Sequence, residues 1–128
     1  MSYLAMVEIW GPKVGSELEL ETRAEEAEKE VSACALRGLH PSLPEASVLW
    51  AAVSEEEREC NGRMCPGHRV TVAIIVPEPL DQDGERDGRW LRFWVESEVS
   101  VALLELINPM TVDRVSVTPA AGGNMERR

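Results

Sequence analysis

The side chains best suited to metal or redox chemistry gather in residues 59–68, which read ECNGRMCPGH. This stretch carries two of the three cysteines and one of the two histidines of the chain, namely Cys60, Cys65 and His68. Their C-x4-C-x2-H spacing offers three of the four ligands that structural zinc usually takes. The fourth would have to come from Cys34 or His40, and a second closely spaced ligand pair is missing. The stretch is therefore an incomplete zinc site, and the expectation is a protein without a cofactor.

Two other uses of the thiols stay open. A disulfide between Cys60 and Cys65 is sterically feasible if the chain turns at Asn61-Gly62, but a reducing compartment disfavours it. A redox CxxC pair is absent, because four residues separate the thiols. The simplest interpretation is a connecting loop that leads into a strand at 69–76.

Catalytic patterns are absent from the sequence. There is no GxxxxGK[ST] or GxGxxG phosphate loop, and neither histidine lies in a recognisable nucleophile motif. The acidic run at 81–87 fails the calcium-loop pattern, since the glycine and the final glutamate do not fall at the required positions. We therefore expect a protein that is not an enzyme.

The charge balance restricts the partners. The net charge is −10, from 23 acidic and 13 basic residues, and such a chain repels nucleic acid and anionic membranes. No apolar run reaches the length needed to span a bilayer, and the N-terminus has no secretory signal pattern. The expectation is a cytoplasmic protein that binds neither nucleic acid nor membrane directly.

The acidic residues are clustered, which points to a protein partner. Residues 17–30 hold seven Glu against one Arg and one Lys, residues 55–59 four Glu against one Arg, and residues 78–87 five acids against one Arg. Such clusters favour binding to a basic or nucleic-acid-binding protein, as inhibitors, immunity proteins and nucleic-acid mimics do. The candidate partner-binding acids are Glu25, Glu26, Glu55, Glu56, Glu57, Asp81, Asp83, Glu85 and Asp87. The alternatives are acidity that serves solubility alone, a small zinc-stabilised module, and a small-molecule-binding domain or enzyme of unknown substrate.

The tryptophans suggest one more contact surface. In the segment 89–97, RWLRFWVES, apolar and polar positions alternate as in a strand, which would put Trp90, Arg92 and Trp94 on one face. Trp and Arg are enriched at interface hot spots, so this stripe is a candidate for partner binding or for a homodimer. Alternatively, the two Trp side chains cover the sheet beneath a helix.

Periodicity predicts the elements that must position these residues. Strands are predicted at 2–10, 69–76, 89–97 and 111–119, and a further strand at 47–53 is favoured over a helix in the segment 40–60. A helix at 22–40 begins with Thr22 and Glu25 in a capping box, and a second helix is predicted at 97–109. Residues 14–21 form either a short exposed strand or the lead-in to the first helix.

The order of these elements indicates an α+β fold. One domain at 1–119 and a loose tail at 120–128 account for the chain. We expect a mixed or antiparallel sheet of about four to five strands with two helices on one face, as in a ferredoxin-like sandwich.

Overall fold

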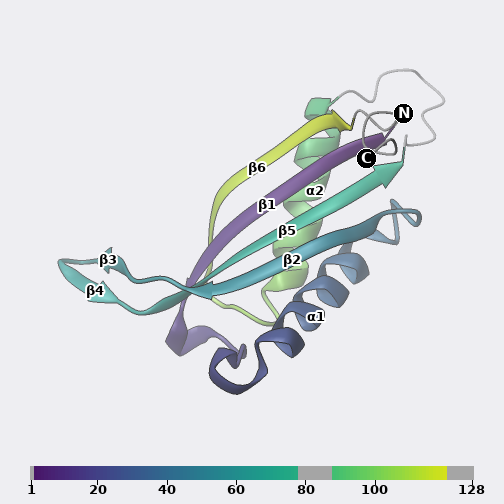
Figure 1. Ribbon diagram of the computed structural model, residues 1–128. Helices are drawn as coiled ribbons and strands as arrows, with labels where there is room; N and C mark the ends of the chain where they lie inside the picture. Colours follow the sequence, from purple (N-terminus) through teal and green to yellow (C-terminus); the bar gives the residue numbers. More distant parts are fainter. Residues whose placement is uncertain (1, 78–87, 121–128) are drawn as a thin grey trace.

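The computed structural model describes residues 2–77 and 88–120, except for the side chains of residues 21, 22 and 88–90. Of the tail predicted at 120–128, residue 120 is the end of the last strand, and residues 121–128 lie outside this part of the chain. In order, the elements are β1 (Ser2–Pro12), the short 3-10 helix η1 (Lys13–Gly15), α1 (Leu20–Leu39), β2 (Ser47–Glu55), β3 (Arg58–Cys60), β4 (Arg63–Cys65), β5 (Gly67–Pro77), α2 (Gly88–Leu103) and β6 (Thr111–Ala120) (Figure 1).

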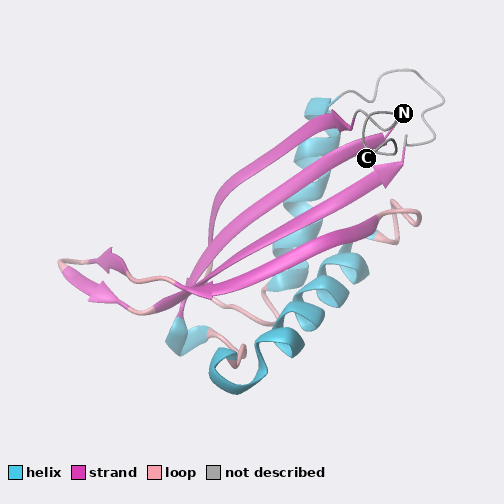
Figure 2. Ribbon diagram, viewed as in Figure 1, coloured by secondary structure: helices cyan, strands magenta, loops and turns pink. Residues whose placement is uncertain are grey.

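Four strands form one antiparallel sheet in the order β2-β5-β1-β6. Both helices cover the same face of this sheet and leave the other face open (Figure 2). Together with the order of the elements along the chain, this strand order defines a ferredoxin-like α+β sandwich. The predicted fold class is confirmed.

The core lies between the sheet and the two helices. Alternate side chains of the central strands point toward the helices, because successive strand residues face opposite sides; they are Ala5, Val7 and Ile9 of β1 and Val70, Val72 and Ile74 of β5. Both strands therefore bury an apolar row on the helix side, and the residues that alternate with this row lie on the open face.

The strands predicted at 2–10, 47–53, 69–76 and 111–119 lie within β1, β2, β5 and β6. Among the described residues, no helix has the length and apolarity needed to cross a membrane.

The first helix is confirmed, but its beginning differs from the prediction. It starts at Leu20, after Glu19, whose side chain makes no capping hydrogen bond. Arg23 has non-helical torsion angles, with φ −142° and ψ 43°, so the helix is kinked there. Residues 14–21 run through η1 into the helix, with a single bridge between Ser16 and Ile107, so they are the lead-in and not a strand.

The predicted strand at 89–97 is wrong, because these residues belong to α2. The helix predicted at 97–109 accordingly begins at Gly88 and ends at Leu103. Buried residues recur every fourth position at Leu91, Val95 and Val99, which is helical spacing, whereas Phe93 between the first two is 69% exposed. The alternation was misleading because positions 91 and 95 fit both a period of two and one of 3.6.

The loop predicted for 59–68 is also wrong. Strands β3 and β4 form a hairpin closed by Asn61 and Gly62, whose φ angles are 52° and 78°, as in the tight turns that favour Asn-Gly. This hairpin, called the arm below, lies between β2 and β5 and projects past the end of the main sheet (Figure 1). The two strands on either side of the arm, β2 and β5, pair with each other in the main sheet.

Candidate functional site

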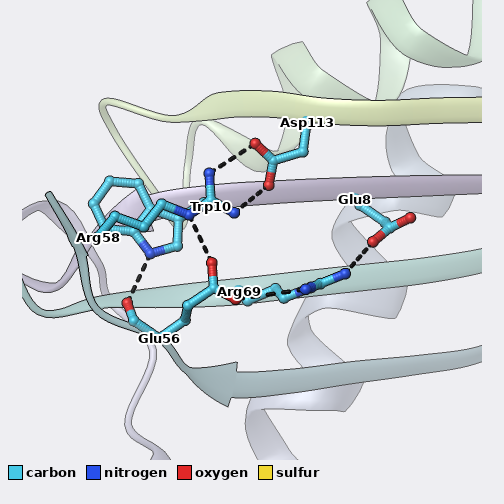
Figure 3. A network of polar contacts seen from close by, with 6 residues as sticks. All are labelled: Glu8, Trp10, Glu56, Arg58, Arg69 and Asp113. Atoms are coloured by element: carbon cyan, nitrogen blue, oxygen red, sulfur yellow. Dashed lines mark hydrogen bonds and ion pairs between the residues drawn. The ribbon is translucent and has the colours of Figure 1, made fainter.

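Charged side chains gather on the open face of the sheet, where the arm leaves it (Figure 3). Glu8 and Trp10 lie on the open side of β1, and Arg69 of β5 pairs in register with Trp10. Arg58 at the start of the arm and Asp113 of β6 reach the same place from either side. Asp113 sits where the β1–β6 register shifts, so a bulge presents its carboxylate to the arm.

Arg58 is the centre of this cluster. Its Nε donates to Glu56 Oε2 at 2.6 Å, and its Nη1 donates to Asp113 Oδ1 at 2.8 Å. Its Nη2 donates to the second oxygen of the same Asp113 carboxylate. This two-pronged contact is the geometry in which arginine binds a carboxylate most strongly. The first residue of the arm is thereby fixed to the edge strand β6.

The ring of Trp10 packs against the guanidinium of Arg58. The Arg58 Cζ lies 5.2 Å from the centroid of the Trp10 ring, within the range of a cation–π contact. The indole Nε1 donates to the carbonyl oxygen of Glu56 at 2.8 Å. The ring also covers Gly67, where a Cβ would overlap Trp10 Cζ2 and Cε2. Trp10 is 5% exposed, so the ring is held between the guanidinium and the backbone of β5.

Arg69 extends the cluster across the sheet. Its Nη1 lies 3.5 Å from Glu56 Oε1, and its Nη2 donates to Glu8. The side chains alternate in charge, and we call the set the charge ladder: Asp113, Arg58, Glu56, Arg69 and Glu8. The ladder connects β6, the arm, β5 and β1 through side chains alone.

The contacts within the ladder favour the charged forms of Asp113, Glu56, Arg58 and Arg69. Hydrogen bonds from Arg58 lower the pKa of Asp113 and of Glu56 from their usual ranges. The same contacts raise the pKa of Arg58, most strongly through Asp113, and the contact with Glu8 raises that of Arg69. None of these groups is tuned toward neutral pH as a general acid or base would be. The arrangement is suited to holding the arm in place.

The predicted acidic candidates lie in different environments. Glu56 belongs to the ladder, and Glu55 accepts a hydrogen bond from Lys13 Nζ at 3.0 Å, which lowers the pKa of Glu55. Glu57 is exposed, as are Glu25 and Glu26 on α1. The four candidates of the third cluster, Asp81, Asp83, Glu85 and Asp87, lie outside the described residues.

Trp90, Arg92 and Trp94 do not form the predicted strand face. In a helix, residues two positions apart point in widely different directions. Position 92 is therefore on a different side of α2 from positions 90 and 94. Arg92 Nε donates to the Val115 carbonyl oxygen at 2.9 Å, and Trp94 packs half-buried against the core. The Trp90 side chain is not described. A role of these residues in partner binding stays a prediction.

The incomplete zinc site is not assembled. His68 is 2% exposed and points to the helix side of the sheet, with Nδ1 2.8 Å from Ser16 Oγ. Cys34 lies between the helices, 3.0 Å from the Ala102 carbonyl oxygen, and His40 contacts the Ala46 carbonyl oxygen. Within residues 2–77 and 88–120, no three His, Cys, Asp or Glu side chains are grouped to hold a metal ion.

Most residues of the charge ladder could not be recognised as a group from the sequence. Arg58 and Arg69 stand out only as basic residues near the cysteines, while Glu8, Trp10 and Asp113 lie far from them in the chain. The two residues of β1 share a period-two face, which was a usable signal. Asp113 carried none, because only the strand register and the bulge bring it to Arg58.

Comparison with known proteins finds no matching family model and no matching curated protein. The solved structures that resemble the chain include the full extracellular region of zebrafish Gpr126/Adgrg6, with a TM-score of 0.47 and 8% identity; the match covers 91% of this chain and 13% of that one. A phage SAM lyase in complex with S-methyl-5'-thioadenosine matches at a TM-score of 0.45 and 18% identity, over 93% of this chain and 90% of the other.

A de novo designed protein with a ferredoxin fold matches at a TM-score of 0.33 and 16% identity, over 95% of this chain and 88% of the design. These likenesses are too weak to carry a functional argument. The fold assignment rests on the order and direction of the strands.

Proposed function

We propose that this protein is not an enzyme and acts by binding a basic protein through the N-terminal half of α1. The surface, called the acidic face below, is formed by exposed carboxylates on and just before the helix: Glu17, Glu19, Glu25, Glu26 and Glu30. The observation that carries the proposal is the contrast between these carboxylates and those elsewhere on the molecule.

Elsewhere in the described part of the chain, five carboxylates are bound by basic side chains. Arg58 and Arg69 bind three of them in the charge ladder, Lys13 binds Glu55, and Arg37 binds Glu105 at 2.7 Å. On the acidic face, Arg23 alone forms ion pairs among the described residues, 3.9 Å from Glu19 and 3.6 Å from Glu26. This side of the molecule therefore carries an excess of negative charge directed at solvent.

The chemistry of this face favours a basic partner, such as the nucleic-acid-binding surface of another protein. Opposite charges steer the encounter of two proteins and align them, and the effect weakens as salt screens the charges. Acidic residues near a helix N-terminus also stabilise the helix. A test must therefore separate binding from folding. The free thiols fit the cytoplasm as the compartment we propose, because it keeps cysteines reduced.

The test compares two triple variants with the same change in net charge. Glu25→Gln/Glu26→Gln/Glu30→Gln removes charge from the acidic face, and Glu45→Gln/Glu59→Gln/Glu96→Gln removes it from exposed positions elsewhere. Each is used for affinity purification from the native host at low and high salt, with thermal unfolding of both measured in parallel. We expect the wild type and the second variant to retain the same basic protein at low salt. The first variant should lose it while remaining folded at the temperature of the binding experiment.

Loss of the partner from both variants alike would show that only net charge matters, and would remove the acidic face as the binding surface. Retrieval of a neutral or acidic protein, or binding that ignores salt, contradicts the proposal as a whole.

Self-association is a second candidate, favoured by an exposed apolar strip on α2. Phe93 and Val101 of α2 and Leu104, the residue that follows the helix, are solvent-exposed, and such an apolar strip would suit a homodimer. Analytical ultracentrifugation of the wild type and of Phe93→Ser/Val101→Ser decides between the two. A dimer that the double variant abolishes supports this use of α2, and a monomer at all concentrations removes it.

A further inference from the structure

The arm places two cysteines on one face of a two-stranded hairpin. Cys60 pairs in register with Arg63, and Cys65 pairs with Arg58. Directly paired residues and residues two apart share a face of an antiparallel ladder, so Cys60 and Cys65 are diagonal neighbours on that face. Glu59 and Met64 occupy the opposite, exposed face. The register therefore brings together two thiols that four residues separate in the sequence.

The two thiols lie on the same face of the arm and are reachable from solvent. A hydrogen bond between their side chains raises the pKa of Cys65. Both cysteines are reduced and half-buried, whereas Cys34, in the core between the helices, is 1% exposed. Small reagents can therefore reach Cys60 and Cys65 but not Cys34, which serves as an internal control for thiol reactivity.

We propose that Cys60 and Cys65 are a redox modification site, at which exchange with a small-molecule disulfide such as oxidised glutathione forms a reversible intramolecular disulfide. This use of the arm does not depend on the binding of a basic partner to α1. The site differs from the predicted zinc ligand set, because His68 faces the other side of the sheet.

The exchange occurs in two steps. The Cys60 thiol loses its proton to solvent, and the thiolate attacks one sulfur of oxidised glutathione; a protein–glutathione bond forms and one glutathione thiolate leaves, to be protonated. Cys65 then loses its proton and attacks Cys60 Sγ, which releases the second glutathione. The two protein thiols are oxidised and one glutathione disulfide is reduced to two thiols. The reverse order, in which Cys65 attacks the oxidised glutathione first, gives the same disulfide and the same two glutathione thiols.

The geometry also indicates that the disulfide is easily reduced. Diagonal neighbours in a ladder stand roughly 7 to 8 Å apart, whereas the Cα atoms of a relaxed disulfide are about 5.5 to 6 Å apart. Closing the bond must therefore shear the two short strands, and a strained disulfide has a more oxidising potential. Because Arg58 pairs with Cys65, this shear acts on the residue that fixes the arm to Asp113.

The experiment titrates the intact protein with mixtures of reduced and oxidised glutathione. Samples are quenched in acid, alkylated, digested and analysed by mass spectrometry. We expect a species that has lost two hydrogen atoms, with Cys60 linked to Cys65 and Cys34 alkylated only after denaturation. Reduced glutathione in excess should reverse the change completely. Cys60→Ser and Cys65→Ser serve as comparisons, and circular dichroism checks that each variant is folded.

Each outcome decides the proposal. With Cys65→Ser, the glutathione adduct at Cys60 should accumulate, because the second thiol that would displace it is missing. Stable adducts on both cysteines of the wild type, disulfide-linked dimers in place of the internal bond, or no reaction in excess oxidised glutathione would each overturn the assignment. Since the wild type provides the main readout, a variant that failed to fold would not affect the conclusion.

Discussion

Arg58 and Trp10 lie stacked, with the Arg58 Cζ 5.2 Å from the centroid of the indole ring. The contact joins the beginning of the arm to the end of β1, which are far apart in the chain. The same guanidinium donates hydrogen bonds to both oxygens of the Asp113 carboxylate. The Arg58 side chain thereby connects a hairpin that has no strand pairing with the main sheet to both β1 and β6.

A double-mutant cycle measures the strength of this attachment. Arg58→Gln and Asp113→Asn each break the two-pronged ion pair, whose side chains are 31% and 26% exposed. We expect the two changes to be coupled in the free energy of unfolding by about 1 to 2 kcal/mol, since the pair is partly shielded from water. Urea denaturation of the four proteins gives this value. A coupling near zero would mean that the ion pair positions the arm without stabilising the folded protein.

The close approach of Trp10 and Gly67 predicts a sharp steric effect. In Gly67→Ala, the new methyl group would overlap the indole and come within 2.6 Å of the Gly11 carbonyl oxygen. Because the ring is confined by Arg58 above and β5 below, we expect a loss of roughly 2 to 3 kcal/mol in unfolding free energy. The emission of Trp10 should change as well. Replacing Trp10 by Leu in the same background should recover part of the lost stability, which distinguishes this clash from a general effect on β5.

His68 predicts a pH dependence of stability in a defined window. Burial lowers the pKa of His68, an effect that Glu55 opposes in part and Lys13 reinforces. The folded protein therefore binds fewer protons at this site than the unfolded chain, whose histidine titrates near pH 6.5. The contribution of His68 is complete above that pH and is lost as the pH falls toward the lowered pKa.

Thermal unfolding between about pH 5 and pH 8 checks this effect, since the unfolded pKa lies inside that range. The slope below neutral pH should flatten in His68→Gln. Glu56 and Asp113 lose their contribution only below about pH 4, because hydrogen bonds from Arg58 lower their pKa values from a range near 4. An unchanged slope in the variant would assign the pH dependence to other groups.

Two substitutions in α2 test its helical register. Leu91 is 1% exposed, whereas Phe93, two residues later, lies on the solvent side. We expect Leu91→Ala to cost about 2 to 4 kcal/mol of unfolding free energy, and Phe93→Ala to stay within about 0.5 kcal/mol in dilute solution. Both are read from urea denaturation. Equal losses from the two variants would contradict the helix.

Much of the fold could be predicted from the sequence, because the central strands are apolar on the face that they bury. The runs at 2–10 and 69–76 are β-branched and bounded by Pro or Gly, and they became the two central strands. The segment at 89–97 was missed, since Leu91 and Val95 fit a period of two as well as a helical repeat. The residue that separates the two patterns is Phe93, which a period of two would bury together with Leu91 and Val95 but which is exposed.

The candidate site was much harder to predict than the fold. Acidity could be counted, but which carboxylates remain available to a partner depends on which arginines reach them. Glu56 looked like part of an acidic surface and is bound by Arg58 and Arg69. Glu25 looked equivalent in the sequence and remains exposed on α1. Pairing between distant segments determines this difference, and local patterns do not contain it.

The turn at the tip of the arm offers a place to extend or label the chain. A Cβ at Gly62 would meet no atom of the described residues within 4 Å, and the arm beyond Arg58 is paired only with itself. Exposed hairpin tips tolerate insertions well. A short peptide tag or a fluorophore placed between Asn61 and Gly62 should therefore leave the sheet and both helices intact, and would report on the arm directly.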